Sequence, residues 1–205
     1  MQRRSLGDEH PDTLTSISNL ASLLRIQGKL GEAEPLCREA LSARRRTLGD
    51  EHPDTLASIN NPAELLCDLH TSEALFRESL AGCRRFLGDT HPLTVWPMTG
   101  LATCLRRQGR FDEALPLVEA AHAGRCATLG EGHPDARHSA HELGVLLRLL
   151  GAPQRALPHA RAAFEGRLRA LGAAHRATLA SQLSFAHLQG DAALASLLAP
   201  NGNME

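Results

Sequence analysis

The chain has 205 residues, with 22 Lys and Arg against 23 Asp and Glu, so its formal net charge is −1. This balance argues against a surface built to bind nucleic acid or a membrane over its whole extent. With five Phe, one Trp and no Tyr, the core must consist mainly of Leu and Ala, which suits closely packed helices.

A nine-residue segment, Leu-Gly-Asp-Glu-His-Pro-Asp-Thr-Leu, occurs at residues 6–14 and again at 48–56. Shorter copies begin at Leu87, Leu129 and Leu171, which makes the spacings 42, 39, 42 and 42 residues. A fixed period of this size predicts a solenoid of helix–turn–helix repeats that bury their apolar faces against one another. We therefore expect an all-α fold of about nine main helices without strands. The expected repeats are 6–47, 48–86, 87–128, 129–170 and a partial repeat 171–198, followed by a disordered tail at 199–205.

The first repeat shows the pattern of its two helices. Pro11 suits the first position of a helix, which Gln27 and Gly28 end. A second helix then ends in Arg44, Arg45 and Arg46, where cations suit the negative end of the helix dipole. Each helix carries an apolar stripe at helical spacing, formed by Ile17, Leu20, Ala21 and Leu24 in the first and by Leu30, Ala33, Cys37, Ala40 and Leu41 in the second.

The second repeat departs from this pattern. It is three residues shorter, and the missing piece matches the turn Gly28-Lys29-Leu30. Pro62 stands in the position of Leu20, and we expect the helix to restart there with Asn61 as its N-cap. Trp96-Pro97 in the third repeat is expected to behave in the same way. Residues 57–75 are therefore predicted to be the least stable segment.

Both ends of the sequence are irregular. Arg3, Arg4 and Leu6 align with Arg45, Arg46 and Leu48, so the first residues correspond to the last turn of a second helix. This predicts a fragment of a longer protein, or an end covered by a partner, because solenoids need capped ends. Near the other end, Gly190 comes three residues early, and 191–198 is expected to form only a short helix.

Catalytic and metal-binding motifs are absent. The sequence contains no phosphate loop, GxGxxG, GxSxG or HExxH, so we predict no enzyme activity and no cofactor. His138 and His141, with His133, Glu142 or His159, are the best candidate metal ligands, but they do not form a recognised set. The thiols share no repeat position and are expected to be buried or incidental in a reducing, cytoplasmic protein without a membrane span; they are Cys37, Cys67, Cys83, Cys104 and Cys126.

Histidines recur at one position of the repeat, just before each expected helix start. Their place predicts a structural role and not a metal-binding or catalytic one. They are His10, His52, His91, His133 and His175.

A polar stripe runs along the first helices, on the side away from their apolar residues. In the first repeat it contains Thr15, Ser18, Ser22 and Arg25. The equivalent positions later include Trp96, Arg106, His138, His141 and Arg148, and Arg107 flanks Arg106. Arginine suits carboxylates, and the histidines are expected to add charge below about pH 6.5. Alternatively, these arginines belong to an ordinary solvated face and Trp96 fills the core beside Pro97.

The segments Leu6–Leu14, Asn19–Ala21 and Gly31–Leu41 resemble the 42-residue tetratricopeptide repeats of kinesin light chains and their relatives. This resemblance implies a right-handed α–α superhelix whose first helices line a concave groove that binds peptides or proteins. Asn19 and Asn61 match the Asn that holds a bound peptide backbone in that family, whereas Gly100 and Glu142 replace it later. The heptad coiled coil of kinesin light chains has no counterpart in this sequence.

The sequence therefore predicts a non-catalytic scaffold that binds a protein or an extended, acidic peptide, with no nucleic acid and no membrane as partner. Because Glu64 and Asp68 interrupt the basic stripe, we expect the peptide to favour the third and fourth repeats. The alternatives are a regulatory repeat segment of a larger nucleotide-binding or signalling enzyme and a cargo-adaptor fragment of a kinesin complex. The predicted partner-binding residues are Asn19, Arg25, Asn61, Trp96, Arg106, Arg107, His138, His141 and Arg148.

Overall fold

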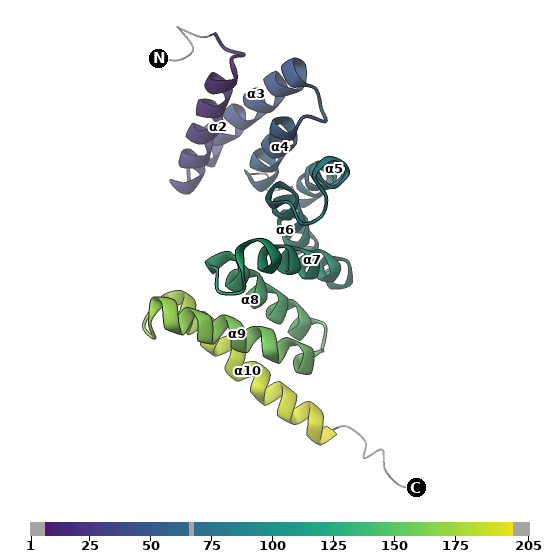
Figure 1. The fold of residues 1–205 in the computed structure, drawn as a ribbon, viewed down its shortest axis with the longest axis vertical. Coiled ribbons are helices and arrows are strands. Elements are labelled where there is room, and N and C mark those ends of the chain that lie inside the picture. The colour runs from purple at the N-terminus through teal and green to yellow at the C-terminus, as the bar shows by residue number, and fades with distance from the viewer. Residues whose placement is uncertain (1–6, 66–67, 199–205) are drawn as a thin grey trace. The chain divides into compact units, whose positions relative to one another are not determined.

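The protein is described from a computed structural model, which covers residues 7–65 and 68–198, with side chains up to residue 190. Within these residues every regular element is an α-helix (Figure 1). Contacts divide the chain into an N-terminal body, Met1–Gln108, and a C-terminal body, Gly109–Glu205. The helices are α2 Pro11–Ile26, α3 Leu30–Leu48, α4 Pro53–Leu65, α5 Leu69–Leu87, α6 Pro92–Arg107, α7 Phe111–Leu129, α8 Pro134–Leu149, α9 Pro153–Leu171 and α10 Arg176–Leu198.

Within each body, helices that follow one another in sequence pack against one another (Figure 1). In the N-terminal body α3 lies between α2 and α4, and α5 lies between α4 and α6. In the C-terminal body α8 contacts α7 and α9, and α10 packs on α9. First helices of neighbouring repeats also touch, as in the pairs α2–α4, α4–α6 and α8–α10. The predicted all-α repeat fold of nine helices without strands is confirmed for the described residues.

The histidine before each first helix caps that helix. In all five cases the imidazole Nδ1 accepts a hydrogen bond from the backbone N–H two residues later, which satisfies one of the free donors of the first turn. The predicted structural role is thus confirmed. The pairs are His10 with Asp12, His52 with Asp54, His91 with Leu93, His133 with Asp135 and His175 with Ala177, at 3.1 to 3.2 Å.

The predicted helix restarts at Pro62 and Pro97 are wrong. Both α4 and α6 continue through their proline, and both prolines are buried. An interior proline removes a single i→i−4 hydrogen bond and costs about 3 kcal/mol. The packing of these buried faces against α3 and α5 outweighs that local cost, so the helix persists.

The three-residue deletion falls where the structure describes the chain only in part. Residues 27–29 separate α2 from α3, whereas the assignment made for the turn of the second repeat involves residues 66 and 67, which lie outside the described residues. Asp68 caps α5, and its carboxylate accepts the backbone N–H groups of His70 and Thr71 at 3.3 and 3.0 Å.

Helix α10 continues through Gly190 to Leu198. The expected stop at Gly190 and the separate short helix over 191–198 are therefore wrong, because an interior glycine costs only about 1 kcal/mol and does not end a helix that packs on a neighbour. The assignments made for residues 1–6, for Cys67 and for the tail at 199–205 fall outside the described residues. Among the described residues, no helix is long and apolar enough to cross a membrane.

The core is built from small and aliphatic side chains that join one repeat to the next. Leu65 of α4 packs on Ala21 of α2 and on Ala33 and Cys37 of α3. Leu188 of α10 packs in the same way on α8 and α9, where Ala156 and Ala160 receive it. In both cases a first helix inserts a leucine into a surface of small residues on the preceding repeat.

Asn60 of α4 is an exception in this core. Its side chain is fully buried (0 % exposed), and neither Oδ1 nor Nδ2 has a hydrogen-bond partner among the described residues. A buried amide without partners costs about 1–3 kcal/mol. We therefore expect Asn60→Leu, a change of similar volume, to raise the free energy of unfolding by about 1–3 kcal/mol.

Chemical denaturation would measure this gain. The matched control is Asn19→Leu, because Asn19 lies exposed on α2 and its replacement relieves no desolvation. A loss of stability in Asn60→Leu would mean that the amide has partners that the described residues do not include.

Candidate partner-binding face

In the N-terminal body, the carboxylate of Glu64 links two residues of the polar stripe, Arg25 and Trp96. Glu64 of α4 accepts a hydrogen bond from the indole Nε1 of Trp96 on α6 at 2.6 Å, and its other oxygen lies 3.2 Å from Nη1 of Arg25 on α2. Trp96 is 36 % exposed, whereas Pro97 beside it is buried. The alternative that Trp96 fills the core is therefore wrong. The structure brings Arg25 and Trp96 together, and the residue between them is acidic.

The remaining arginines of the stripe are differently placed. Arg106 is half-buried and Arg107 is exposed at the end of α6, and Arg148 is exposed at the end of α8. Within the described part of the chain, no ion pair involves any of these three guanidinium groups. Their charge is consequently available at each helix end, whereas the charge of Arg25 is already neutralised by Glu64.

The two stripe histidines lie beside a third basic residue. Nδ1 of His138 lies 3.5 Å from Nη2 of Arg167 on α9, and Nδ1 of His141 is buried without a partner among the described residues. Burial, together with the charges of Arg167 and His138, lowers the pKa of His141. His141 therefore stays neutral to a lower pH than expected from the sequence.

The asparagine position of the stripe varies for a steric reason. Asn19 is exposed and Asn61 is half-buried, and Gly100 occupies the same position on α6. A Cβ atom on Gly100 would lie 2.3 Å from the ring of Phe76, which is 2 % exposed on α5. Phe76 stands where Cys37 stands in the first repeat, so a larger ring has taken the space that the asparagine uses elsewhere.

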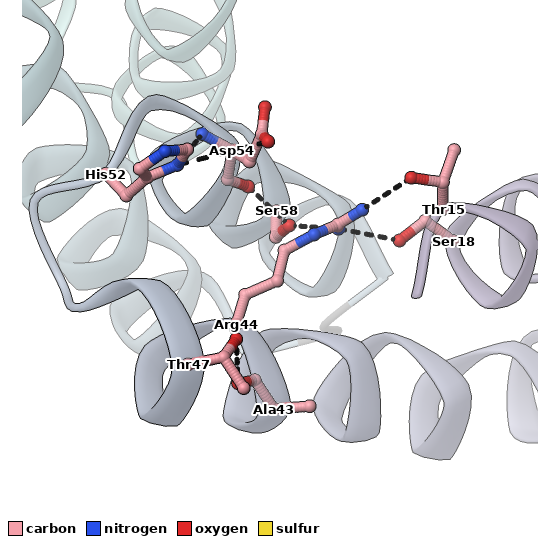
Figure 2. A network of polar contacts seen from close by, with 8 residues as sticks. All are labelled: Thr15, Ser18, Ala43, Arg44, Thr47, His52, Asp54 and Ser58. Atoms are coloured by element: carbon pink, nitrogen blue, oxygen red, sulfur yellow. Dashed lines mark hydrogen bonds and ion pairs between the residues drawn. The ribbon is translucent and has the colours of Figure 1, made fainter. Parts of the chain in front are cut away.

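The expectation that Arg44 acts simply as a cation at the end of its helix is wrong. Arg44 does not act as a solvated cation at the helix end, because it is 9 % exposed and reaches across to two neighbouring helices (Figure 2). Its Nη1 donates to Ser18 of α2 at 3.0 Å and to Ser58 of α4, and its Nη2 donates to Thr15 at 3.3 Å. Burial lowers the pKa of the guanidinium, while Asp54 opposes that change. Arg44 thus ties three helices together.

A recurring spacing marks this contact. Arg44 and Ser58 are 14 residues apart, as are Arg167 of α9 and Ser181 of α10, which are also hydrogen-bonded. Arg167 is likewise 9 % exposed. In the second repeat both partners have changed together, to Cys83 and Pro97, the former fully buried. Arg125 and Ser139 have the same spacing, but there Ser139 donates to Ala136 O and lies 3.1 Å from Nδ1 of His122. The Arg–Ser spacing is therefore only a partial signal of this contact.

A cysteine and two histidines meet in the C-terminal body. Cys126 Sγ lies 3.6 Å from Nδ1 of His122, whose ring packs edge-on against His159 with centroids 5.6 Å apart. Burial raises the pKa of the Cys126 thiol and lowers the pKa of both imidazoles. These shifts disfavour a thiolate–imidazolium pair, which a nucleophilic cysteine requires. Among the described residues, no three His, Cys, Asp or Glu side chains lie together as metal ligands would.

Two half-buried histidines, His122 and His159, make stability depend on pH. His122 and His159 occupy positions that hold Leu80 and Leu117 in other repeats. Because their folded-state pKa values are lowered by burial, the unfolded chain binds protons more readily below about pH 6.5. Stability is then complete above that pH and falls as the pH decreases.

We expect the melting temperature to be lower at pH 5.5 than at pH 7.5, and the double variant His122→Leu/His159→Leu to show a smaller difference. Thermal unfolding followed by circular dichroism measures both. The control replaces His187, which is exposed on α10. An unchanged pH dependence in the double variant would contradict this assignment.

Comparisons with known proteins agree on one family. Two tetratricopeptide repeat models match the chain, one at residues 13–54 and 137–177 and the other at 63–127. Among solved structures, the kinesin light chain nearly identical TPR-like repeats of Podosopora anserina share 26% identity over 92% of this chain and 91% of that chain, with a TM-score of 0.78. A variant of the same protein gives a TM-score of 0.77 at 26% identity, covering 92% and 90%.

BtubC (BKLC) from P. vanneervenii has the same fold, with a TM-score of 0.71 at 19% identity over 100% of this chain and 91% of that chain. No curated protein sequence matches the chain.

Proposed function

Because the chain belongs to the tetratricopeptide repeat family, we propose that it is a non-catalytic, cytoplasmic scaffold that binds a protein or an extended peptide along its first helices. Repeats of this kind present long surfaces to partners. The likeness to the kinesin light chain repeats of Podosopora anserina supports this class of function.

The chemistry of the proposed ligand follows from which arginines are paired. Glu64 already neutralises Arg25, whereas Arg106, Arg107 and Arg148 make no ion pair with the described residues. This contrast is the observation that carries the proposal. A guanidinium presents a planar fork that suits carboxylates, so the ligand is an acidic peptide. Its candidate contacts are Arg106 and Arg107 in the N-terminal body and, separately, Arg148 in the C-terminal body. Trp96 supplies an exposed aromatic surface on α6.

Trp96 is the sole tryptophan of the chain, so its fluorescence reports binding directly. We expect acidic peptides to change Trp96 emission and basic peptides to leave it unchanged, with weaker binding at higher salt. Charge reversal in Arg107→Glu/Arg148→Glu should weaken binding at least about tenfold, or about 1.4 kcal/mol. The matched control is Arg38→Glu, because Arg38 is exposed on the second helix α3. Equal binding of basic peptides would overturn the proposal.

The variant Glu64→Gln should strengthen peptide binding, whereas the charge reversals weaken it. It removes the negative charge that neutralises Arg25 and loosens the bond to Trp96. We expect tighter binding of the same acidic peptide, because Arg25 then adds a fourth guanidinium whose charge is not neutralised. Weaker binding in Glu64→Gln would show that Glu64 itself contacts the ligand, and the acidic-peptide assignment would be wrong.

A further inference from the structure

The fourth repeat contains a cavity of about 570 Å³ beside the loop that leads into α8. The cavity lies wholly within the C-terminal body, where this loop and the start of α8 face the C-terminal half of α9. Its volume falls in the range of sites that hold small molecules, about 300–1,000 Å³. The small residues Gly132, Ala162 and Gly166 leave room in it, and charged side chains line the rest.

One of these charged residues, Arg169 of α9, has lost a partner that earlier repeats provide. In the first and second repeats, an arginine near the end of the second helix binds a glutamate in the loop before the first helix. Arg169 keeps the position of that arginine, but Gly132 replaces the glutamate. Nε of Arg169 donates to the backbone oxygen of Glu165 at 3.3 Å, and Arg169 makes no ion pair with any residue that the structure describes. The earlier pairs are Arg46 with Glu9 and Arg85 with Glu51, at 2.6 and 2.7 Å.

Glu131, in the loop before α8, has also lost its partner. A carboxylate at this position, directly after the Leu-Gly that ends a second helix, binds the arginine five residues before it in two earlier repeats. Cys126 replaces that arginine here, and Glu131 makes no ion pair with the described part of the chain. The earlier pairs are Arg45 with Asp50 and Arg84 with Asp89, at 3.2 and 2.6 Å.

The other two charged residues that line the cavity already have partners. Glu165 accepts a hydrogen bond from Nε of Arg161 at 2.7 Å. The guanidinium of Arg137 donates to two backbone carbonyl oxygens, those of Gly132 and Gly166. Among the described residues that line the cavity, one guanidinium and one carboxylate are therefore left without a charged partner. The equivalent place in the second repeat, where these ion pairs are present, holds a cavity of only about 230 Å³.

We propose that the cavity of the fourth repeat binds a small zwitterion, such as an amino acid. The carboxylate of the ligand meets Arg169 and its ammonium meets Glu131, so the ligand supplies both of the charges that side chains supply in earlier repeats. A guanidinium binds a carboxylate through parallel N–H donors, and an ammonium donates to a carboxylate. Because Arg169 and Glu131 are both exposed, we expect dissociation constants on the order of 1–10 mM.

Saturation-transfer difference NMR of the full chain measures binding in this range. We expect saturable binding of at least one of three zwitterions that differ in the spacing of their charges, namely glycine, β-alanine and γ-aminobutyrate. The acid and the amine of matching length each lack one charge. They should bind about fivefold more weakly, which is the scale of one exposed ion pair.

Variants of the cavity test the role of each charge. Gly132→Glu restores the internal partner of Arg169 and should weaken binding about fivefold, as should Arg169→Gln. Gly132→Ala is the matched control, because a Cβ atom there would meet nothing within 4 Å, and it should bind as the wild type does. Glu131→Gln should bind the zwitterion no better than the matching acid. Arg46→Gln should leave binding unchanged, because Arg46 already pairs with Glu9.

Several results would overturn the proposal. They are the absence of saturable binding of all three zwitterions, and equal binding of the zwitterion and both single-charge probes. Wild-type binding in Gly132→Glu would place the ligand elsewhere. An equal loss in Arg46→Gln and Arg169→Gln would show attraction to any exposed arginine. Circular dichroism of each variant confirms that it has folded. The variant Arg107→Glu/Arg148→Glu, which tests the acidic-peptide proposal, changes no residue that lines this cavity, so the two proposals can fail independently.

Discussion

Gly100→Ala is expected to destabilise the N-terminal body by about 1–3 kcal/mol. The added Cβ atom would lie 2.3 to 2.7 Å from three atoms of the Phe76 ring. That ring is 2 % exposed, and a closely packed interior has little room into which it can move. Helix propensity alone would favour alanine over glycine by about 1 kcal/mol, so even the sign of the change tests the packing.

Urea denaturation of two further variants completes this test. Phe76→Val reproduces the residue of the equivalent position, Val118, and should remove most of the penalty when combined with Gly100→Ala. Gly31→Ala on α3 is the matched control, because its Cβ atom would meet nothing within 4 Å. We expect it to stay within about 1 kcal/mol of the wild type. A stabilised Gly100→Ala would show that Phe76 is free to move.

Arg44→Leu is expected to lower the free energy of unfolding by about 2 kcal/mol, the scale of a hydrogen bond to a charged group. The change removes the bonds from Arg44 to Thr15, Ser18 and Ser58. The two serines keep a partner, since Ser18 also donates to Leu14 O and Ser58 to Asp54 O. The loss is therefore smaller than it would be if polar groups were left buried without bonds.

A double-mutant cycle with Ser58→Ala separates the Arg44–Ser58 bond from the rest of the contact. We expect Ser58→Ala to cost less in the Arg44→Leu background than in the wild type. Arg46→Leu is the control, because Arg46 is 62 % exposed in its pair with Glu9 and should cost no more than about 1 kcal/mol. Equal effects of Arg44→Leu and Arg46→Leu would contradict a structural role for Arg44.

Much of the fold could be predicted from sequence, because the recurring Leu-Gly segment gives the length of the repeat directly. The helix starts at Pro11 and Pro53 were predictable, since a histidine cap and a proline recur together at one position. The continuous helices at Pro62 and Pro97 were not. Helix propensity gives the free-energy cost of an interior proline. Whether the helix continues depends also on how its faces pack against other helices, which propensity does not include.

The candidate site was less predictable because its key contacts join distant residues. Glu64 looked like an interruption of a basic stripe, but it bridges Arg25 and Trp96, which lie on two other helices. The sequence predicted that Arg44 is a cation at a helix end. Its role as a buried hydrogen-bond donor could not be predicted without knowing that Ser58 of the next helix lies beside it. The identity of the exposed residues was predictable, whereas their pairing depends on side-chain placement.

The Arg–Ser contact has a consequence for how this chain can be recombined. Arg44 and Ser58 lie on opposite sides of the Leu48-Gly49 boundary, so a module cut at Leu-Gly separates the two partners. Grafting residues 129–170 in place of 48–86 would put Arg167 opposite Pro97, which offers no hydroxyl. Chimeras joined within the turns between first and second helices, such as residues 27–29, inherit arginine and serine as a pair. The segment to exchange in this chain therefore consists of the second helix of one repeat together with the first helix of the next.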